Sequence, residues 1–152
     1  MGDWQAGEFS IFDLIKSEKS KLQRLEGREA DMHVMSKEEA SVFDSEHGER
    51  IYELIGRGVG ERTEWHSVAY VMIPAGKSSQ LHYHPEAEES YYILQGKARM
   101  ILGDEEATIL PGQVVLIPPE TPHKITNVGE SDLAFLAVCV PAWEATNTVP
   151  LE

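Results

Sequence analysis

Cysteine and basic residues are scarce in this 152-residue chain. It has one cysteine, so no internal disulfide can form, and its 26 acidic residues outnumber the 13 lysines and arginines. The formal net charge of −13 argues against nucleic acid, which requires a basic surface, and against anionic membranes. Acidity of this degree is typical of a surface that keeps a protein soluble. We therefore expect neither a nucleic-acid nor a membrane partner.

Long apolar runs and targeting signals are also missing from the sequence. No apolar run reaches the roughly 20 residues that cross a bilayer. The segment Met1-Gly2-Asp3-Trp4-Gln5 has neither the basic start nor the apolar stretch of a secretory signal, so we expect a cytoplasmic protein. The lone Cys139 lies in the apolar run 133–140, where we expect a buried and inert thiol.

Several common catalytic motifs are absent as well. The chain has no Gly-x-Ser-x-Gly, no Cys-x-x-Cys, no Rossmann fingerprint and no glycine-rich phosphate loop that opens a helix. The glycines at 56, 58 and 60 follow a predicted strand but precede no helix, which indicates a turn. These absences argue against a serine nucleophile, a redox dithiol and a nucleotide cofactor.

Histidines at a spacing of two are the strongest positive signal. On an extended strand, His82 and His84 point to the same face. Glu89 opens the next apolar run, and His123 is available downstream. Three neutral imidazoles and one carboxylate suit one divalent transition metal such as Mn, Fe, Co, Ni, Cu or Zn. We therefore predict a metal site at His82, His84, Glu89 and His123.

These residues resemble the two motifs of the cupin superfamily. The first motif is matched at every spacing by Gly76, His82, His84, Glu89 and Gly96, and the second by Gly112, Pro118, His123 and Asn127. Glu120 departs from the pattern, because the family usually has glycine there for a turn. The resemblance covers roughly residues 50 to 140. The short segment between the two motifs is similar to that of the compact single-domain microbial cupins. It implies an all-β fold, the double-stranded β-helix or jelly-roll barrel, with a metal held by these four side chains.

The pattern of apolar residues divides the chain into three parts. Residues 1–49 form an N-terminal extension with a helix over about 11–25, residues 50–140 the barrel, and residues 141–152 a tail that contains Trp143. Gly96-Lys97 and Gly103-Asp104 are expected to be hairpin turns. The barrel strands are expected at 51–55, 67–74, 80–84, 90–94, 98–102, 106–110, 114–117, 123–127 and 134–140.

Strand parity suggests which side chains surround the metal. Tyr91 and Ile93 share the parity of Glu89, and Gln80 shares that of the two histidines. Tyr91 is thus the candidate general acid or base, although it can equally be part of the pocket wall. The other predicted lining residues are Tyr70, Met72 and Met100.

Two functions remain open at this stage. Four protein ligands leave coordination positions free, as in catalytic sites, which favours a metal-dependent enzyme that acts on a small molecule. Resemblance to single-domain cupins implies dioxygenase, sugar isomerase or lyase chemistry without choosing among them. The alternative is a non-catalytic module that binds or senses a small ligand. Because edge strands of a jelly roll need cover, we also predict a homodimer.

Overall fold

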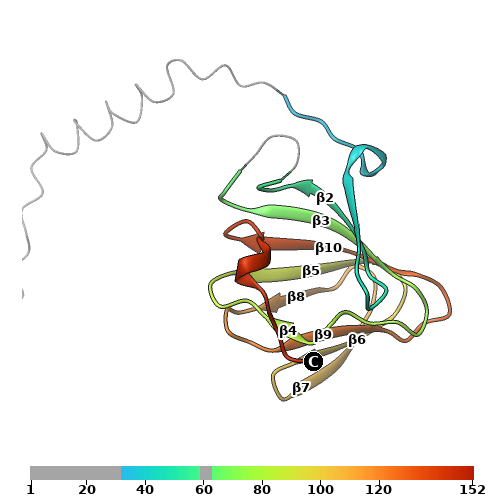
Figure 1. Ribbon diagram of the computed structural model, residues 1–152. Helices are drawn as coiled ribbons and strands as arrows, with labels where there is room; N and C mark the ends of the chain where they lie inside the picture. Colours follow the sequence, from blue (N-terminus) through green and yellow to red (C-terminus); the bar gives the residue numbers. More distant parts are fainter. Residues whose placement is uncertain (1–31, 59–62) are drawn as a thin grey trace, which may run out of the picture. The chain divides into compact units, whose positions relative to one another are not determined.

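The computed structural model describes residues 32–58 and 63–152, and these form an all-β fold (Figure 1). The helix expected over about 11–25 lies outside the described residues. In chain order the elements are η1 (Lys37–Glu39), β1 (Ser41–Asp44), β2 (Arg50–Ile55), β3 (Ser67–Ile73), β4 (His82–Tyr83), β5 (Glu88–Gln95), β6 (Ala98–Leu102), β7 (Glu105–Ile109), β8 (Val114–Ile117), β9 (His123–Asn127), β10 (Leu133–Val140), η2 (Ala145–Asn147) and β11 (Val149–Pro150).

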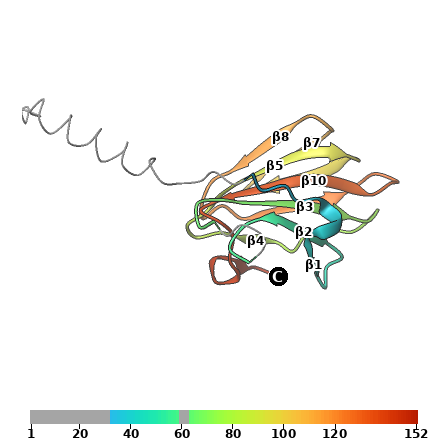
Figure 2. The same cartoon turned by 90° about the horizontal axis from the view of Figure 1, so that it is seen from above.

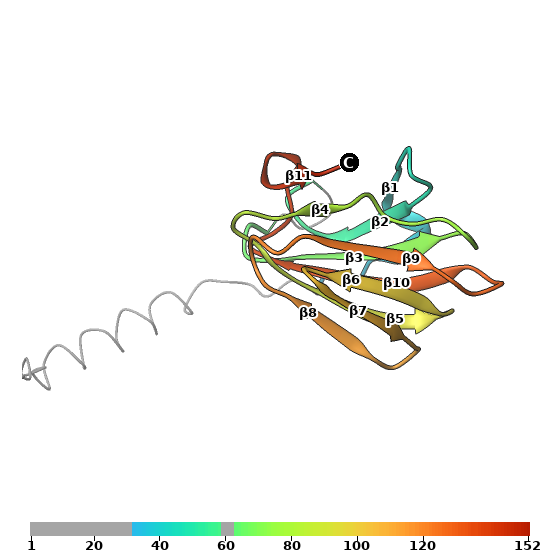
Figure 3. The same ribbon diagram turned by 90° about the horizontal axis from the view of Figure 1, so that it is seen from below.

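Two antiparallel sheets face each other. The larger sheet has the order β1-β2-β3-β10-β5-β8, whose inner members can be followed in Figure 2. The smaller sheet has the order β11-β4-β9-β6-β7 and is turned toward the viewer in Figure 3. Strands that are neighbours in space are often distant in the chain, as β3 and β10 are. This arrangement confirms the double-stranded β-helix expected from the sequence.

Two strands were not anticipated. β1 pairs with β2 in the larger sheet, although it lies within the 1–49 segment that was predicted to be an extension. β11 pairs with β4 in the smaller sheet, although it lies within the predicted tail. Both strands are short, and a strand of two to four residues shows too little alternation to be recognised from its sequence. Among the described residues, no helix is long and apolar enough to cross a membrane.

Glycine sets the geometry at two of the turns. Gly103 has a φ of 57° and joins the hairpin partners β6 and β7, as predicted. Gly96 has a φ of 89°, and a Cβ there would lie 2.9 Å from the backbone of Asp132 and Leu133. The predicted hairpin at Gly96-Lys97 is wrong, because β5 and β6 belong to different sheets. The glycine instead permits the close backbone approach where the chain changes sheet.

The hydrophobic core fills the space between the two sheets. Alternate residues of each strand point inward, so Ile93 on β5 is fully buried while Leu94 beside it is 42% exposed. Phe135 of β10 packs in the same interior. The buried apolar side chains of this cluster are Val71, Ile73, Tyr91, Ile93, Ala98, Met100, Ile117, Ile125, Leu133 and Phe135.

Candidate metal centre

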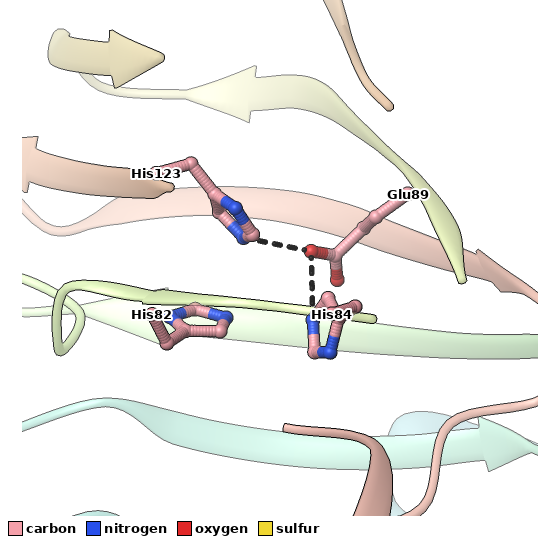
Figure 4. Close-up of side chains that lie close together, drawn as sticks. All are labelled: His82, His84, Glu89 and His123. Carbon is pink, nitrogen blue, oxygen red and sulfur yellow. Dashed lines mark ion pairs between the residues drawn. The ribbon is translucent and has the colours of Figure 1, made fainter. Parts of the chain in front are cut away.

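Four predicted ligands meet at one end of the barrel interior. His82 of β4 is the register partner of His123, the first residue of β9. His84 follows β4, and Glu89 is the second residue of β5 in the opposite sheet. Figure 4 shows the three imidazoles and the carboxylate turned toward one another. The two-residue spacing of the histidine pair places both rings on the same side, as the sequence predicted.

The geometry is tight enough for the four groups to share one ion. One potential ligand atom from each residue lies within 4.8 Å of those from the other three. Glu89 Oε2 is 3.2 Å from His123 Nε2 and 3.4 Å from His84 Nε2. His123 is fully buried, and His84 and Glu89 are nearly so. The site is therefore shielded from bulk water, and a carboxylate buried in this way is costly unless a partner compensates its charge.

Backbone carbonyls fix the orientation of all three imidazoles. His82 Nδ1 lies 2.8 Å from the carbonyl oxygen of Gln80, and His123 Nδ1 lies 2.9 Å from that of Thr121. His84 Nδ1 lies 2.6 Å from the carbonyl oxygen of Asn147. A carbonyl oxygen can only accept, so each Nδ1 carries a proton. In a neutral ring each Nε2 then presents a lone pair, which is the arrangement of a metal-ligating histidine.

Two buried polar atoms at the centre of this cluster have no hydrogen-bond partner. They are Glu89 Oε2 and His123 Nε2, the only such side-chain atoms over residues 32–58 and 63–152. Buried polar atoms almost always find a partner, and exceptions call for an explanation such as an ion. Lone pairs that converge without a donor between them repel one another, and a cation would remove this repulsion. The donor set thus fits a divalent transition metal.

Burial and neighbouring charges shift the pKa values of the candidate ligands. Burial lowers the pKa of His82 to about 4, assisted by the neighbouring His123, so this ring is neutral near pH 7. Burial alone would raise the pKa of Glu89, but contacts with His123 and His84 reverse the effect and lower it. For His84, burial lowers the pKa but the contacts with Glu89 outweigh it and raise the pKa, so metal binding would displace a proton from this ring.

Cys139 contacts the carboxylate oxygen of Glu89 that does not face the histidines. Its Sγ donates to Glu89 Oε1 over 3.2 Å, and the two residues are register partners in the β5–β10 pair. Burial, and then the charge of Glu89, raises the pKa of the thiol, which therefore stays protonated. The expectation of a buried cysteine is confirmed, at 3% exposure. Its contact with Glu89 could not be predicted without the strand register.

The turn before β9 contains the motif departure at Glu120. This residue has a φ of 59°, the left-handed region that the family usually fills with glycine. Its N–H donates to the carbonyl oxygen of His84 over 2.7 Å. One turn thus connects the segments that hold His84 and His123, and a glutamate adopts the conformation that the pattern demands.

A cavity of about 510 Å³ opens from the candidate ligands. Tyr91 and Gln80 line it, as expected from their parity. Tyr91 is 4% exposed, its ring centroid is 6.0 Å from that of His123, and burial followed by the charge of Glu89 raises its pKa well above the usual value. The phenol therefore keeps its proton near neutral pH.

The other four predicted lining residues lie elsewhere. Tyr70 and Met72 have the wrong parity, because the β3 residues that line the cavity are Ser67, Ala69 and Val71. Tyr70 instead packs edge to face with Tyr52, with Lys37 Nζ 4.9 Å from its ring centroid. The remaining two, Ile93 and Met100, point inward but lie in the hydrophobic core. An apolar alternating strand does not reveal from its sequence which face is interior.

Part of the cavity wall comes from segments that sequence reasoning did not assign to the site. Residues of β1 and of the β1–β2 loop line it, and so do Trp143 and Thr148 of the tail. Trp143 Nε1 donates to Thr148 Oγ1 over 3.0 Å. Apolar runs on both sides of Gly48, which has a φ of 101°, are the signal that could have indicated the β1–β2 hairpin.

Comparison with known proteins agrees with the fold and the motifs. Residues 69–139 match the family described as Cupin domain. An uncharacterized protein of Methanocaldococcus jannaschii is 40% identical over 86 residues, which are 57% of this chain and 69% of that protein. A glucose-6-phosphate isomerase of Thermococcus onnurineus is 38% identical over 64 residues, which span 38% of this chain but only 34% of the isomerase.

A solved structure extends the similarity to three dimensions. The crystal structure of a predicted oxalate decarboxylase from Thermotoga maritima superposes with a TM-score of 0.65 at 25% identity. The superposition covers 72% of this chain and 99% of that protein. Matching motifs, matching sequence and a matching barrel lead to the same conclusion: this chain belongs to the cupin family.

Proposed function

We propose that the protein is a metal-dependent cupin enzyme that acts on a small molecule in the barrel cavity. His82, His84, Glu89 and His123 would hold one divalent transition metal ion: Mn, Fe, Co, Ni, Cu or Zn. The observation that supports this most strongly is the pair of orphaned, fully shielded atoms, Glu89 Oε2 and His123 Nε2, at the centre of four convergent donors. Without a metal, these two atoms can pair only with each other, and only when His123 carries a second proton.

Four protein ligands would leave coordination positions open toward the cavity. A bound ion would supply Lewis acidity or a water molecule of lowered pKa at these positions. Three backbone carbonyls would hold the imidazole rings in the ligating tautomer, and the Cys139 thiol would hold Glu89. The buried wall around them excludes bulk water, which strengthens electrostatic interactions inside the cavity.

Tyr91 is the side chain proposed for proton chemistry. It lines the cavity next to His123, and its raised pKa favours a phenol that donates a proton or hydrogen bond over one that acts as a base. Tyr91→Phe removes only the hydroxyl. We expect this variant to keep metal binding and lose turnover, whereas a residue that only forms the wall would keep both.

The substrates named for the relatives are poor candidates for this cavity. Oxalate and glucose 6-phosphate are both anions, whereas Glu46, Glu49 and Glu53 line the cavity of this chain. An acidic wall opposes the approach of an anion. We therefore propose a reaction of the dioxygenase, isomerase or lyase type without assigning it the substrate of either relative.

Metal analysis of variants tests the proposal directly. Elemental mass spectrometry of the untagged protein should find about one divalent metal per chain, and metal should raise the thermal midpoint. His84→Ala should lose both effects, whereas His66→Ala, outside the cluster, should keep both. If the wild-type protein holds no stoichiometric metal and gains no stability from it, the proposal fails. If a small ligand binds equally well without metal, the non-catalytic binding module replaces the enzyme.

We also propose a homodimer. Edge strand β8 and its neighbour β5 expose apolar side chains on their outer face, including Val114 at 63%, Leu116 at 55% and Tyr92 at 44%. Contiguous exposed apolar surface of this kind is typical of subunit interfaces. Light scattering at micromolar concentration should give twice the 17.0 kDa chain mass. A monomeric mass would contradict the dimer.

A further inference from the structure

The cavity has a second chemical character besides the candidate metal centre. Imidazoles aside, every charged side chain among the described residues that line it is a carboxylate: Glu46, Glu49, Glu53 and Glu89. Glu89 belongs to the proposed ligand set, and a divalent ion would more than neutralise it. The other three come from the β1–β2 hairpin and lie outside that set. The hairpin thus gives the cavity an acidic wall.

Glu49 is the most constrained of these acids. It lies at the end of the β1–β2 loop, where its Oε2 accepts from Ser45 Oγ over 3.0 Å and its N–H donates to the same hydroxyl over 3.2 Å. The carboxylate is therefore held in place rather than free in solvent. Burial raises the pKa of Glu49, the Ser45 hydrogen bond and the neighbouring His47 oppose this shift, and the charge of Glu89 adds to it. A ligand with a positive charge would relieve the cost of ionising it.

Glu53 adds a second partly buried carboxylate. It is the register partner of Ala69, which also lines the cavity. Burial raises the pKa of Glu53 as well. Aromatic side chains accompany the two acids, because Phe43 and Trp143 line the same cavity. Carboxylates together with aromatic faces are the groups that bind organic cations.

Several nearby basic side chains are paired outside the cavity. Arg50 Nε lies 2.6 Å from Asp44 Oδ1, and Lys124 Nζ lies 2.6 Å from Glu152 Oε1. Arg57 lies within 4.0 Å of both Glu64 and Glu144. None of these three lines the cavity. Among the described residues, the acids of the wall are therefore not neutralised by a lysine or arginine of the wall.

We propose that the cavity binds a small organic cation, with an ammonium group against Glu49, the other wall acids adding to the negative potential, and an oxygen donor directed to the metal centre. Only the contact between the oxygen donor of the ligand and the metal centre depends on the proposed function. The aromatic rings of Phe43 and Trp143 would cover the apolar part of the ammonium group. A cavity of about 510 Å³ has room for a molecule of this kind.

A pair of probes with the same shape isolates the charge. Choline and 3,3-dimethylbutan-1-ol share the hydroxyl and the three methyl groups, and differ in a charged nitrogen against a neutral carbon. Calorimetry on the full-length, manganese-loaded protein should show choline binding about tenfold more tightly than the neutral alcohol. Equal affinities, or failure of both probes to bind, would overturn the inference.

Matched variants assign the preference to the acidic wall. Glu49→Gln keeps the shape of the side chain and should reduce the ratio of the two affinities to about threefold, with a smaller loss for Glu53→Gln, whose carboxylate acts from farther away. Glu105→Gln removes an exposed acid on β7, outside the cavity, and should leave the ratio unchanged. If Glu49→Gln and Glu105→Gln have the same ratio as the wild type, the wall does not select for charge.

Metal content measured on the same samples separates this inference from the proposed function. If the protein binds metal but does not prefer choline, only the cation inference fails. If the protein binds no metal but still prefers choline, the enzyme proposal fails and the cation site stands. Loss of metal in Glu49→Gln would show instead that Glu49 supports the metal centre, and this outcome would also count against the inference.

Discussion

Along β5 the inward side chains change from Glu89 through Tyr91 to Ile93, and along β9 they change from His123 through Ile125 to Asn127. The same strands thus build two different ends of one barrel interior. We call the end with the four candidate ligands the site end, and the end with Ile73, Ile93, Ile125 and Asn127 the core end.

The two ends differ in how their polar groups are satisfied. At the core end, Asn127 Nδ2 donates to the carbonyl oxygens of Ile73 and Ser131, each over 2.8 Å, and its Oδ1 accepts from Gly129. At the site end, Glu89 Oε2 and His123 Nε2 have no hydrogen-bond partner. The core end should therefore be stable by itself, whereas the site end should depend on a ligand.

The largest expected effect is at the core end. Ile93→Ala leaves a cavity beside fully buried neighbours and should lower the free energy of unfolding by about 3–4 kcal/mol. Leu94→Ala on the exposed face of the same strand should change it by about 0.5 kcal/mol or less. Urea unfolding of both variants with and without metal measures this, and a large loss in Leu94→Ala would contradict the assigned parity.

Glu89→Gln should affect the site end alone. We expect it to remove the stabilisation by metal, about 2.7 kcal/mol when free metal is about 100 times its dissociation constant. The metal-free variant serves as the reference, because removing the carboxylate charge also weakens the contacts of residue 89 with His84 and His123. Thermal unfolding with added metal and with chelator makes the comparison. An equal gain from metal in both proteins would remove Glu89 from the ligand set.

Acidification should also weaken the site end. Burial, then His123, lowers the folded-state pKa of His82 to about 4 from 6.5, so the unfolded state binds more protons between these values. Stability of the metal-free protein should therefore fall as the pH decreases from 6.5 toward 4, by about 2 kcal/mol at about pH 5. His82→Gln should show a smaller dependence over this range. Unchanged dependence in the variant would assign the titration to another group.

The tail should contribute a smaller effect through His84. Asn147 Oδ1 accepts from the N–H of Glu86, and its backbone oxygen lies 2.6 Å from His84 Nδ1. Asn147→Ala should loosen this contact and weaken metal binding about tenfold without abolishing it. Glu144→Ala, on an exposed neighbour, is the control and should keep the wild-type affinity in a metal titration. Equal affinities in all three proteins would show that the tail does not position His84.

The smallest effect is expected at the turn between the two histidine segments. Glu120 adopts a φ of 59°, so Glu120→Gly should stabilise the protein by about 0.5–1 kcal/mol, while Glu120→Ala should not. Chemical unfolding of both variants decides this. A destabilised glycine variant would mean that the glutamate side chain makes a contribution larger than the backbone strain.

The candidate ligands could be predicted because strand parity and motif spacing are local properties. His82 and His84 share a face on any extended strand, and the turn required at 120 could be anticipated from the pattern. The residues that line the cavity were harder to predict from the sequence. Tyr70 and Met72 alternate as regularly as Ala69 and Val71, and only the pairing of β3 with β2 and β10 decides which set faces inward.

The sequence by itself determined the nine barrel strands from β2 to β10, the barrel fold and the identity of the convergent donors, because these depend on short-range periodicity and on fixed spacings. Only the tertiary structure decided that Cys139 meets Glu89, that Asn147 meets His84 and that Glu49 borders the same cavity. The chain brings these residues together through strand register and the docking of its ends. Such contacts join residues far apart in sequence, and no local pattern encodes them.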